Sequence, residues 1–545
     1  MDFNRLLSAT NIDRQIFVPA AITILALVVP ISLFPEAAEH YANDLIGRIT
    51  HGLGFLYLMG ALALLLFLSW LAFGRYGDVR LGRAEDKPEY SKFSWIAMMF
   101  CTGMGSSIMN YAFVEPLYFM QGPALGIAAG STQAAEHALA YSFFHWGFSA
   151  YAIYMLPAVP IAYMLFVKRV NLFRMSEAFS GVLGDRVHGP IGKLIDILVI
   201  LGIIGGTATT LGLSGPVLAA LFSQTFGIPN SFGLQVFVLI LWTAIFSWSV
   251  YRGLSNGIQI LSRINAILAA VLLAFVFLTG PTLFILNLTT DSIGILATDF
   301  FRMSLWTDPI AQGGYPQAWT IFYWAWWLAY APMVGLFTAR ISKGRTLREL
   351  ILNGVCFGTL GSWVFFAVWG GYSVFVQTTG GLDLTAILSD QGMPAAILAA
   401  VSGQAMPALF MFAFLVLFMV FTATTMDSAA YVLASMSSSS LAGDQEPTRI
   451  NRVFWAFILG LTAVAMLLMG GLKAVQASSV VLGTPMLFLS VLLAVSFLRM
   501  LREDCGSVLA SRHVIIQPVE TPEVQTAQTS ETTHFPGEAG LPDPS

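Results

Sequence analysis

Long apolar segments alternate with short polar ones along most of the chain. A helix that crosses the hydrocarbon core of a bilayer needs roughly 20 mostly apolar residues. Twelve segments meet this requirement, at residues 16–34, 53–73, 94–120, 139–167, 191–222, 232–250, 259–286, 318–339, 350–377, 403–436, 452–471 and 480–498. Several exceed the minimum length, which indicates tilted or broken helices. The pattern predicts an all-α membrane protein with twelve transmembrane helices.

The basic residues follow the same alternation. If the N-terminus is cytoplasmic, all of the 26 Lys and Arg residues fall on the cytoplasmic side except Arg48, Arg302 and Lys473. Short cytoplasmic loops of membrane proteins are enriched in Lys and Arg. A miscount by one span would invert every later loop and destroy this bias. The distribution therefore predicts that both termini are cytoplasmic.

Two long external segments and a polar end complete the pattern. The external segments are residues 121–138 and 287–317, and the second contains SIGILATDFFRMSLW, with apolar residues at helical spacing. This stretch is expected to lie along the membrane interface. Residues 501–545 are rich in polar residues, Pro and Gly, and we predict a disordered cytoplasmic tail.

Composition narrows the function classes. Only 10% of the 545 residues are charged, whereas a soluble domain carries about 25%. We find no basic patch suited to nucleic acid. The cysteines, Cys101, Cys356 and Cys505, lie far apart, and the seven histidines are scattered. Haem or metal chemistry would need paired histidines or clustered carboxylates in the spans, so neither an enzyme nor a resident cofactor is predicted. A channel or sensor stays a remote alternative.

The third span carries the flexible sequence Gly103-Met104-Gly105-Ser106-Ser107. Glycines at membrane depth are typical of broken helices that expose backbone groups to a transported solute. They are equally typical of close helix packing, so both interpretations stay open. Glu115, further along, is expected near the outer end of the span, at the interface.

The eighth span opens with WTIFYWAWWLAY, residues 319–330, and has four tryptophans within nine residues. This run extends inward by about two helical turns, further than an interfacial belt. Aromatic faces attract a cation that has no hydrogen to donate, at about 0.5–2 kcal/mol per contact. The fourth span adds aromatic residues at Trp146, Tyr151 and Tyr154. The pattern predicts either a cage for a methylated ammonium group or a packed aromatic core.

The tenth span contains the hydroxyl-rich sequence FTATTMDS, residues 421–428. Adjacent hydroxyls with carbonyl oxygens suit a hard cation such as sodium. Threonine within a helix also bonds its own backbone, which is the alternative interpretation here.

Taken together, these motifs resemble the betaine/choline/carnitine transporter (BCCT) family. The most specific stretch is WTIFYWAWW followed by APMVGLFTARISKGRTLREL, with support from GMG, FFHWGFSAYAIY, LGDRVHGPIGKLIDIL and TTMDSAAYVLASM. The resemblance implies a LeuT-like core of two inverted five-helix repeats, formed by spans 3–7 and 8–12. It divides the chain into a cytoplasmic N-terminus with two peripheral helices (1–92), a transport core (93–500) and the tail. It also implies a homotrimer in the bacterial inner membrane.

The resemblance further assigns candidate site residues. The substrate-binding set implied by it comprises Trp326, Trp327, Tyr330, Trp146, Tyr154, Tyr151, Tyr118, Trp324, Gly103, Met104, Gly105, Ser106 and Asn110. The sodium site implied by it comprises Thr424, Thr425, Phe421, Met104 and Cys101. In the sodium-independent carnitine exchanger an arginine of span 7 fills this region, and Arg263 lies near that place but toward the cytoplasm.

The function implied is secondary active import of an onium solute such as carnitine, choline or glycine betaine. Sodium is the expected coupling ion, and alternating access is the expected mechanism. A sodium-independent exchanger or a proton-coupled carrier of the same solutes is the alternative.

Overall fold

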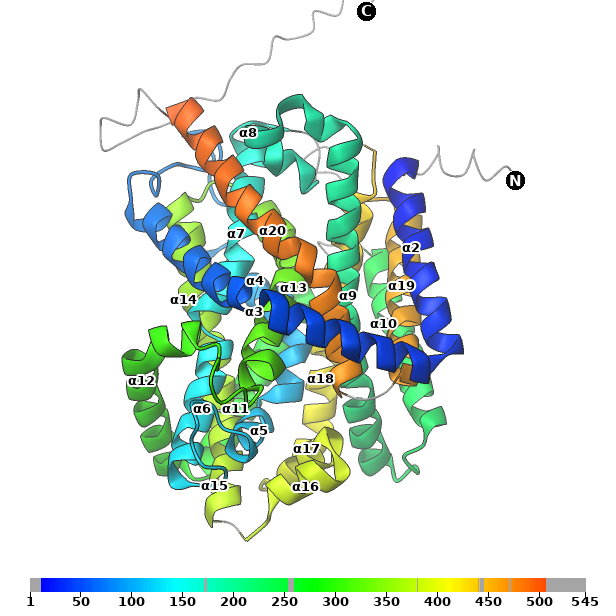
Figure 1. The fold of residues 1–545 in the computed structure, drawn as a ribbon. Coiled ribbons are helices and arrows are strands. Elements are labelled where there is room, and N and C mark those ends of the chain that lie inside the picture. The colour runs from blue at the N-terminus through cyan, green and yellow to red at the C-terminus, as the bar shows by residue number, and fades with distance from the viewer. Residues whose placement is uncertain are drawn as a thin grey trace, which may run out of the picture.

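The computed structural model describes residues 11–170, 174–252, 259–379, 381–439, 441, 446–469 and 472–505. Their side chains are described too, apart from those of residues 101–106, 259–262, 473–475 and 505. The described chain is helical throughout (Figure 1), and its only β pairings are isolated bridges between Ile12 and Ser438 and between Arg80 and Thr346.

The helices follow one another with short connections. Those of the first half are α2 (Arg14–Leu33), α3 (Pro35–Phe73), α4 (Lys92–Tyr111), α5 (Glu115–Gln121), α6 (Thr132–His145), α7 (Phe148–Phe166), α8 (Ser180–Leu183), α9 (Pro190–Phe226), α10 (Phe232–Arg252) and α11 (Gln259–Thr279). Those of the second half are α12 (Thr282–Leu305), α13 (Ile321–Arg340), α14 (Leu347–Phe365), α15 (Gly371–Thr379), α16 (Leu384–Gln391), α17 (Met393–Ser402), α18 (Pro407–Met436), α19 (Arg449–Met469) and α20 (Leu472–Cys505). Short 3₁₀ turns flank α8 at Ser176–Phe179 and Gly184–His188, and π-helical turns precede α13 at Pro316–Thr320 and α15 at Phe366–Gly370.

By length and hydropathy, ten helices of the described chain are able to cross a membrane. They are α2, α3, α6 with α7, α9, α10, α12, α14 with α15, α18, α19 and α20. Nine coincide with predicted spans. The tenth, α12, lies in the segment expected to run along the interface, and most of it is left uncovered by other helices.

Three of the twelve predicted spans are absent from these ten. They form helices, but α4 is diluted by Gly and Ser and α13 by Trp and Tyr, all of which lower hydropathy. The apolar part of α11, Arg263–Thr279, is short. An all-helical membrane protein is therefore confirmed, while the total of twelve spans stays a prediction.

The spans predicted at 94–120 and 139–167 are each broken into two helices, but the first is not broken at Gly103 or Gly105. The backbone of α4 is helical from Lys92 to Tyr111, so it passes through Gly103 and Gly105 without unwinding. The chain turns instead at 112–114, between α4 and α5, and at Trp146 and Gly147, between α6 and α7. In lipid, an unmade backbone hydrogen bond costs more than the roughly 1 kcal/mol penalty of a helical glycine. The helix therefore tolerates both glycines.

Helix α13 lies near the middle of the bundle, whereas α2 and α12 lie on opposite flanks (Figure 1). Every residue from Ile321 to Ala339 is buried. A Cβ added at Gly335 would come within 2.5 Å of Pro157 Cγ, so the two helix backbones of α13 and α7 approach closely there. Small residues permit such approaches between membrane helices, and this one fixes α13 against α7.

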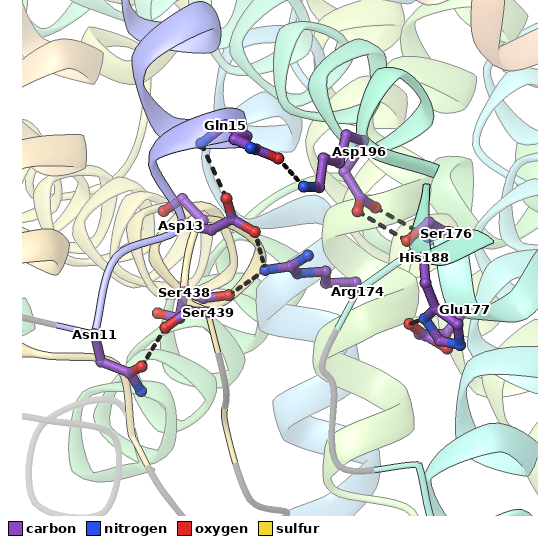
Figure 2. A network of polar contacts seen from close by, with 12 residues as sticks. Asn11, Asp13, Gln15, Arg174, Ser176, Glu177, His188, Asp196, Ser438 and Ser439 are labelled. Atoms are coloured by element: carbon purple, nitrogen blue, oxygen red, sulfur yellow. Dashed lines mark hydrogen bonds and ion pairs between the residues drawn. The ribbon is translucent and has the colours of Figure 1, made fainter. Parts of the chain in front are cut away.

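A polar network joins distant parts of the chain at the end of the bundle where α2 begins (Figure 2). The guanidinium Nη2 of Arg174 donates to Asp13 Oδ2 at 2.7 Å and to the carbonyl of Ser438 at 2.6 Å. Asp13 also caps α2, because its Oδ1 accepts from Gln15 N at 2.9 Å. Asp196 of α9 accepts from both the backbone N and the hydroxyl of Ser176. The network ties α2, α9 and the end of α18 together.

Candidate functional site

The aromatic residues of α13 and of the α6–α7 junction meet inside the bundle. Trp326 and Trp327 stack with ring centroids 5.1 Å apart and an interplanar angle of 9°. Trp146 meets Trp327 edge-on at 4.9 Å, and Tyr154 meets it at 5.7 Å. Tyr330 lies 6.5 Å from Trp326. We call these five residues the aromatic cluster.

The cluster is enclosed by protein. None of its members is more than 2% exposed, so the rings do not face lipid. The break between α6 and α7 places Trp146 against α13, because Trp146 is the residue at which the helix stops. The ring faces contact one another, and a methylated ammonium group would enter by separating them.

Hydrogen bonds fix the orientation of the rings. Trp327 Nε1 donates to the carbonyl of His145 at 3.0 Å, where the end of α6 leaves that oxygen without a helical partner. Trp326 Nε1 donates to the carbonyl of Gly206 in α9 at 3.1 Å. Since the indole N–H groups are engaged, the ring faces are the surfaces left for a ligand.

A chain of hydroxyls connects the cluster to α4 and α9. Tyr330 OH and Thr210 Oγ1 are 2.7 Å apart, and Thr210 Oγ1 lies 3.2 Å from Ser107 Oγ. Asn110 Nδ2 donates to Ser214 Oγ of α9 at 2.7 Å. Asn110 thus holds α4 against α9 in this state. The side chains of Gly103, Met104, Gly105 and Ser106 lie outside the described part of the chain.

Three predicted binding residues lie away from the cluster. Tyr151 hydrogen-bonds Ser362 Oγ of α14 at 2.9 Å, and its ring lies 6.1 Å from that of Tyr154 in the cluster. Trp324 packs against Phe144 on the α6 side of α13, at 5.4 Å. A helix turns by about 100° per residue, so Trp324 and Trp326 point to opposite sides.

Tyr118 is the third residue away from the cluster. It is half-buried, and its ring lies 5.2 Å from that of Trp319. It therefore packs beside the turn that precedes α13 rather than in the cluster itself.

Among the residues beside the cluster, two that were not predicted as binding residues are Tyr111 and Glu115. Tyr111, the last residue of α4, lies 6.1 Å from Trp146 and 6.0 Å from Trp326. Glu115 is fully buried and accepts a hydrogen bond from Trp146 Nε1 at 2.8 Å. The place of Glu115 near the outer end of the span stays a prediction, but its side chain is enclosed by protein, because the turn at 112–114 packs α5 against α6. Tyr111 lies one helical turn after Ser107, so helical spacing could have predicted that it lies on the same face of α4.

The predicted sodium residues of α18 bond their own helix in this state. Thr424 Oγ1 donates to the carbonyl of Phe421 at 2.7 Å, and Thr425 Oγ1 donates to the same carbonyl at 3.1 Å. Both threonines are buried. Three oxygens are therefore gathered at one turn of α18, which fits a hard cation. The side chains of Met104 and Cys101, also predicted here, lie outside the described part.

A residue of α11 approaches this turn. The Nδ2 atom of the buried Asn265 donates to Thr424 Oγ1 at 3.2 Å, and Asn265 Oδ1 has no described partner. Arg263 is exposed, which agrees with an anchoring role at the membrane surface. Asn265 was not predicted as a site residue, because no sequence pattern around it indicates a contact with Thr424.

A bundle of apolar helices around a buried aromatic cluster, with a polar turn on a neighbouring helix, is the arrangement of a multi-pass membrane transporter. Comparison with known proteins specifies the family. The model of the BCCT, betaine/carnitine/choline family transporters matches residues 15–506. The chain belongs to this family, which is a family of transporters and not of enzymes.

Two relatives support the assignment. An uncharacterized transporter, YeaV, of Escherichia coli (strain K12) is 34% identical over 458 residues, which cover 83% of this chain and 95% of the relative. A carnitine transporter of Acinetobacter baumannii (strain ATCC 19606) is 32% identical over 509 residues, which cover 93% of this chain and 92% of the relative.

Proposed function

We propose that this chain imports a quaternary-ammonium or related onium solute by alternating access. The single observation that carries the proposal is the aromatic cluster, whose five rings are buried together and whose indole N–H groups are already bonded. Rings presented in this way attract a cation that cannot donate hydrogen bonds, and they do so more strongly when water is excluded.

The solute class is carnitine, choline, glycine betaine or a similar methylated cation. The A. baumannii relative, named a carnitine transporter, supports an onium with a carboxylate. Because α4 is helical through Gly103 and Gly105, its amides are bonded within the helix. A substrate carboxylate would instead meet the hydroxyls of Ser107 and Thr210, which lie beside Tyr330.

The proposed architecture follows the family. Spans 3–7 and 8–12 form two inverted repeats within residues 93–500, the chain crosses twelve times, and three copies assemble in the bacterial inner membrane. Helix α2 begins and α20 ends on the same side of the bundle (Figure 1). That arrangement supports the proposal that the N-terminus and the C-terminus both lie on the cytoplasmic side.

Sodium is the proposed coupling ion, held by Phe421 O and by Thr424 and Thr425 once their hydroxyls turn away from the helix. The second candidate is a sodium-independent exchanger. The Asn265 amide favours it, because an N–H group directed at Thr424 Oγ1 occupies part of the space that a cation would need. Rotation of that amide by 180° would present Oδ1 instead and favour sodium.

Uptake by proteoliposomes tests the proposal. Purified protein would be reconstituted and supplied with radiolabelled carnitine, choline, glycine betaine and proline, with sodium or potassium outside. We expect saturable uptake of at least one onium, a stimulation of at least tenfold by a sodium gradient, and no uptake of proline. Equal uptake in both salts would favour the exchanger. Saturable uptake of proline without any onium uptake would contradict the proposed function.

A further inference from the structure

A buried carboxylate and a buried imidazole face each other beside the aromatic cluster. Glu115 begins α5 and His145 ends α6, and both side chains are 0% exposed. Glu115 Oε1 and His145 Nδ1 lie 3.9 Å apart. Neither atom has a hydrogen-bond partner of good geometry among the described residues, and the Ser142 hydroxyl of α6 lies beside the Glu115 carboxyl group.

The other oxygen of Glu115 is fully engaged. Glu115 Oε2 accepts from Trp146 Nε1 at 2.8 Å and from the hydroxyl of Tyr323. Trp146 meets Trp327 edge-on at 4.9 Å, so one indole joins the carboxylate to the aromatic cluster. A negative charge on Glu115 would increase the electron density of that indole and strengthen its attraction for a cation.

The other titratable groups around the pair are uncharged phenols. Tyr111 of α4, Tyr141 of α6, Tyr315 before α13 and Tyr323 of α13 face it, and Tyr118 of α5 acts on Tyr111. Asp299 and Arg302 of α12 carry charges that act on Tyr141. In the described part of the chain, no Lys or Arg forms an ion pair with Glu115.

A negative charge on the buried Glu115 carboxylate, without a positive partner, would destabilise this arrangement. A buried carboxylate without a countercharge is strongly destabilising, and two unprotonated acceptors facing each other repel. One proton on either Oε1 or Nδ1 removes both problems, because the pair is then neutral overall, as a carboxylic acid beside an imidazole or as a carboxylate beside an imidazolium. In both forms Nε2 carries a proton, which Thr320 Oγ1 can accept at 3.0 Å.

We propose that Glu115 and His145 together hold one dissociable proton when the aromatic cluster is empty, and that binding of an onium cation displaces this proton to water. The cation then supplies the positive charge that the proton had supplied, and the pair carries a net charge of −1 beside the bound headgroup. This inference rests on the proposed onium site. It adds a proton that moves opposite to the solute at the binding step.

The displacement makes binding pH-dependent with a defined sign. Protons compete with the onium, so affinity rises with pH until the pair has lost its proton, by up to tenfold per pH unit. Glu115→Gln keeps an oxygen that accepts hydrogen bonds from Trp146 and Tyr323, but its side chain has no proton to release and cannot become negative. We expect its affinity to be at least tenfold lower than that of the wild type at high pH and independent of pH.

Isothermal titration calorimetry of the purified full chain tests the inference. Choline, or glycine betaine if choline does not bind, is titrated between pH 5 and 9 in pairs of buffers with different ionisation enthalpies, which gives the protons released per solute bound. We expect a release that approaches one at some pH in the wild type, and none in Glu115→Gln. Glu136→Gln, which alters an exposed carboxylate of α6, is the matched control and should release protons as the wild type does.

The outcomes separate the two proposals. If the wild type binds onium at every pH without releasing protons, or if Glu115→Gln still releases them, the proton inference is overturned while the onium site stands. If no onium binds the wild type, the proposed function fails and the inference fails with it. Should Glu115→Gln not fold, the proton count of the wild type alone decides, with His145→Gln as the second variant, expected to change the pH at which release is largest.

Discussion

Replacement of Trp327 by leucine is expected to weaken onium binding by about tenfold to a hundredfold, equivalent to about 1.4–2.8 kcal/mol. Trp327 contacts Trp146, Tyr154 and Trp326, so it is the central ring of the aromatic cluster. Leucine keeps an apolar side chain at this position but removes one aromatic face, worth about 0.5–2 kcal/mol toward a cation. It also removes the hydrogen bond to the carbonyl of His145, which loosens the position of Trp146.

Trp324→Leu is the matched control for this measurement. Trp324 lies on the same helix and is as buried as Trp327, both at 1% exposure, but it packs on Phe144. Loss of a buried tryptophan destabilises either variant, by a few kcal/mol at most. Equilibrium binding of the labelled onium should fall in Trp327→Leu only. Equal affinity losses in both variants would assign Trp327 to packing and remove it from the site.

Replacement of Thr425 by valine is expected to abolish at least nine-tenths of sodium-stimulated uptake. Valine retains the branched shape of threonine but lacks the hydroxyl oxygen, and hard cations bind through oxygen ligands. The sodium concentration for half-maximal stimulation should rise more than tenfold in proteoliposomes. Uptake without sodium should stay at the wild-type level, because the aromatic cluster is unchanged.

Thr422→Val provides the comparison on the same helix. Thr422 is buried and donates to the carbonyl of Phe418 at 3.1 Å, as Thr425 does to Phe421. Both substitutions therefore remove one hydrogen bond to the helix backbone, and only Thr425→Val removes a proposed sodium ligand. If the two variants respond to sodium alike, the ion lies elsewhere or the carrier is an exchanger.

Much of the fold was predictable because lipid imposes simple rules on sequence. An apolar run of about 20 residues has few alternatives to a spanning helix, and the runs that became α9, α18 and α19 were predicted on that basis. The aromatic run of α13 was predicted as a span even though its hydropathy is low. Its composition indicated the centre of the proposed site, since only function or dense packing retains so many indoles in one helix.

Contacts between distant segments were not predictable in the same way. Glu115 is separated from Trp146 by 31 residues and from Tyr323 by 208, and no local pattern indicates that they meet. The turn that buries Glu115 contains neither Gly nor Pro. Trp324 shows the opposite case, because helical rotation alone predicts that it faces away from Trp326. Helix α12 was expected along the interface from its amphipathic pattern, and its 24 residues also suffice to cross a bilayer, so its placement stays a prediction.

Competition between an onium and its carbon isostere tests most directly whether buried ring faces recognise positive charge. The onium with the strongest uptake is compared with an analogue in which a tert-butyl group replaces trimethylammonium, so that shape is retained and charge is lost. Attraction by the aromatic cluster predicts that the neutral analogue displaces labelled onium at least tenfold less well. Equal displacement by the two compounds would contradict the account, because the rings would then recognise only shape.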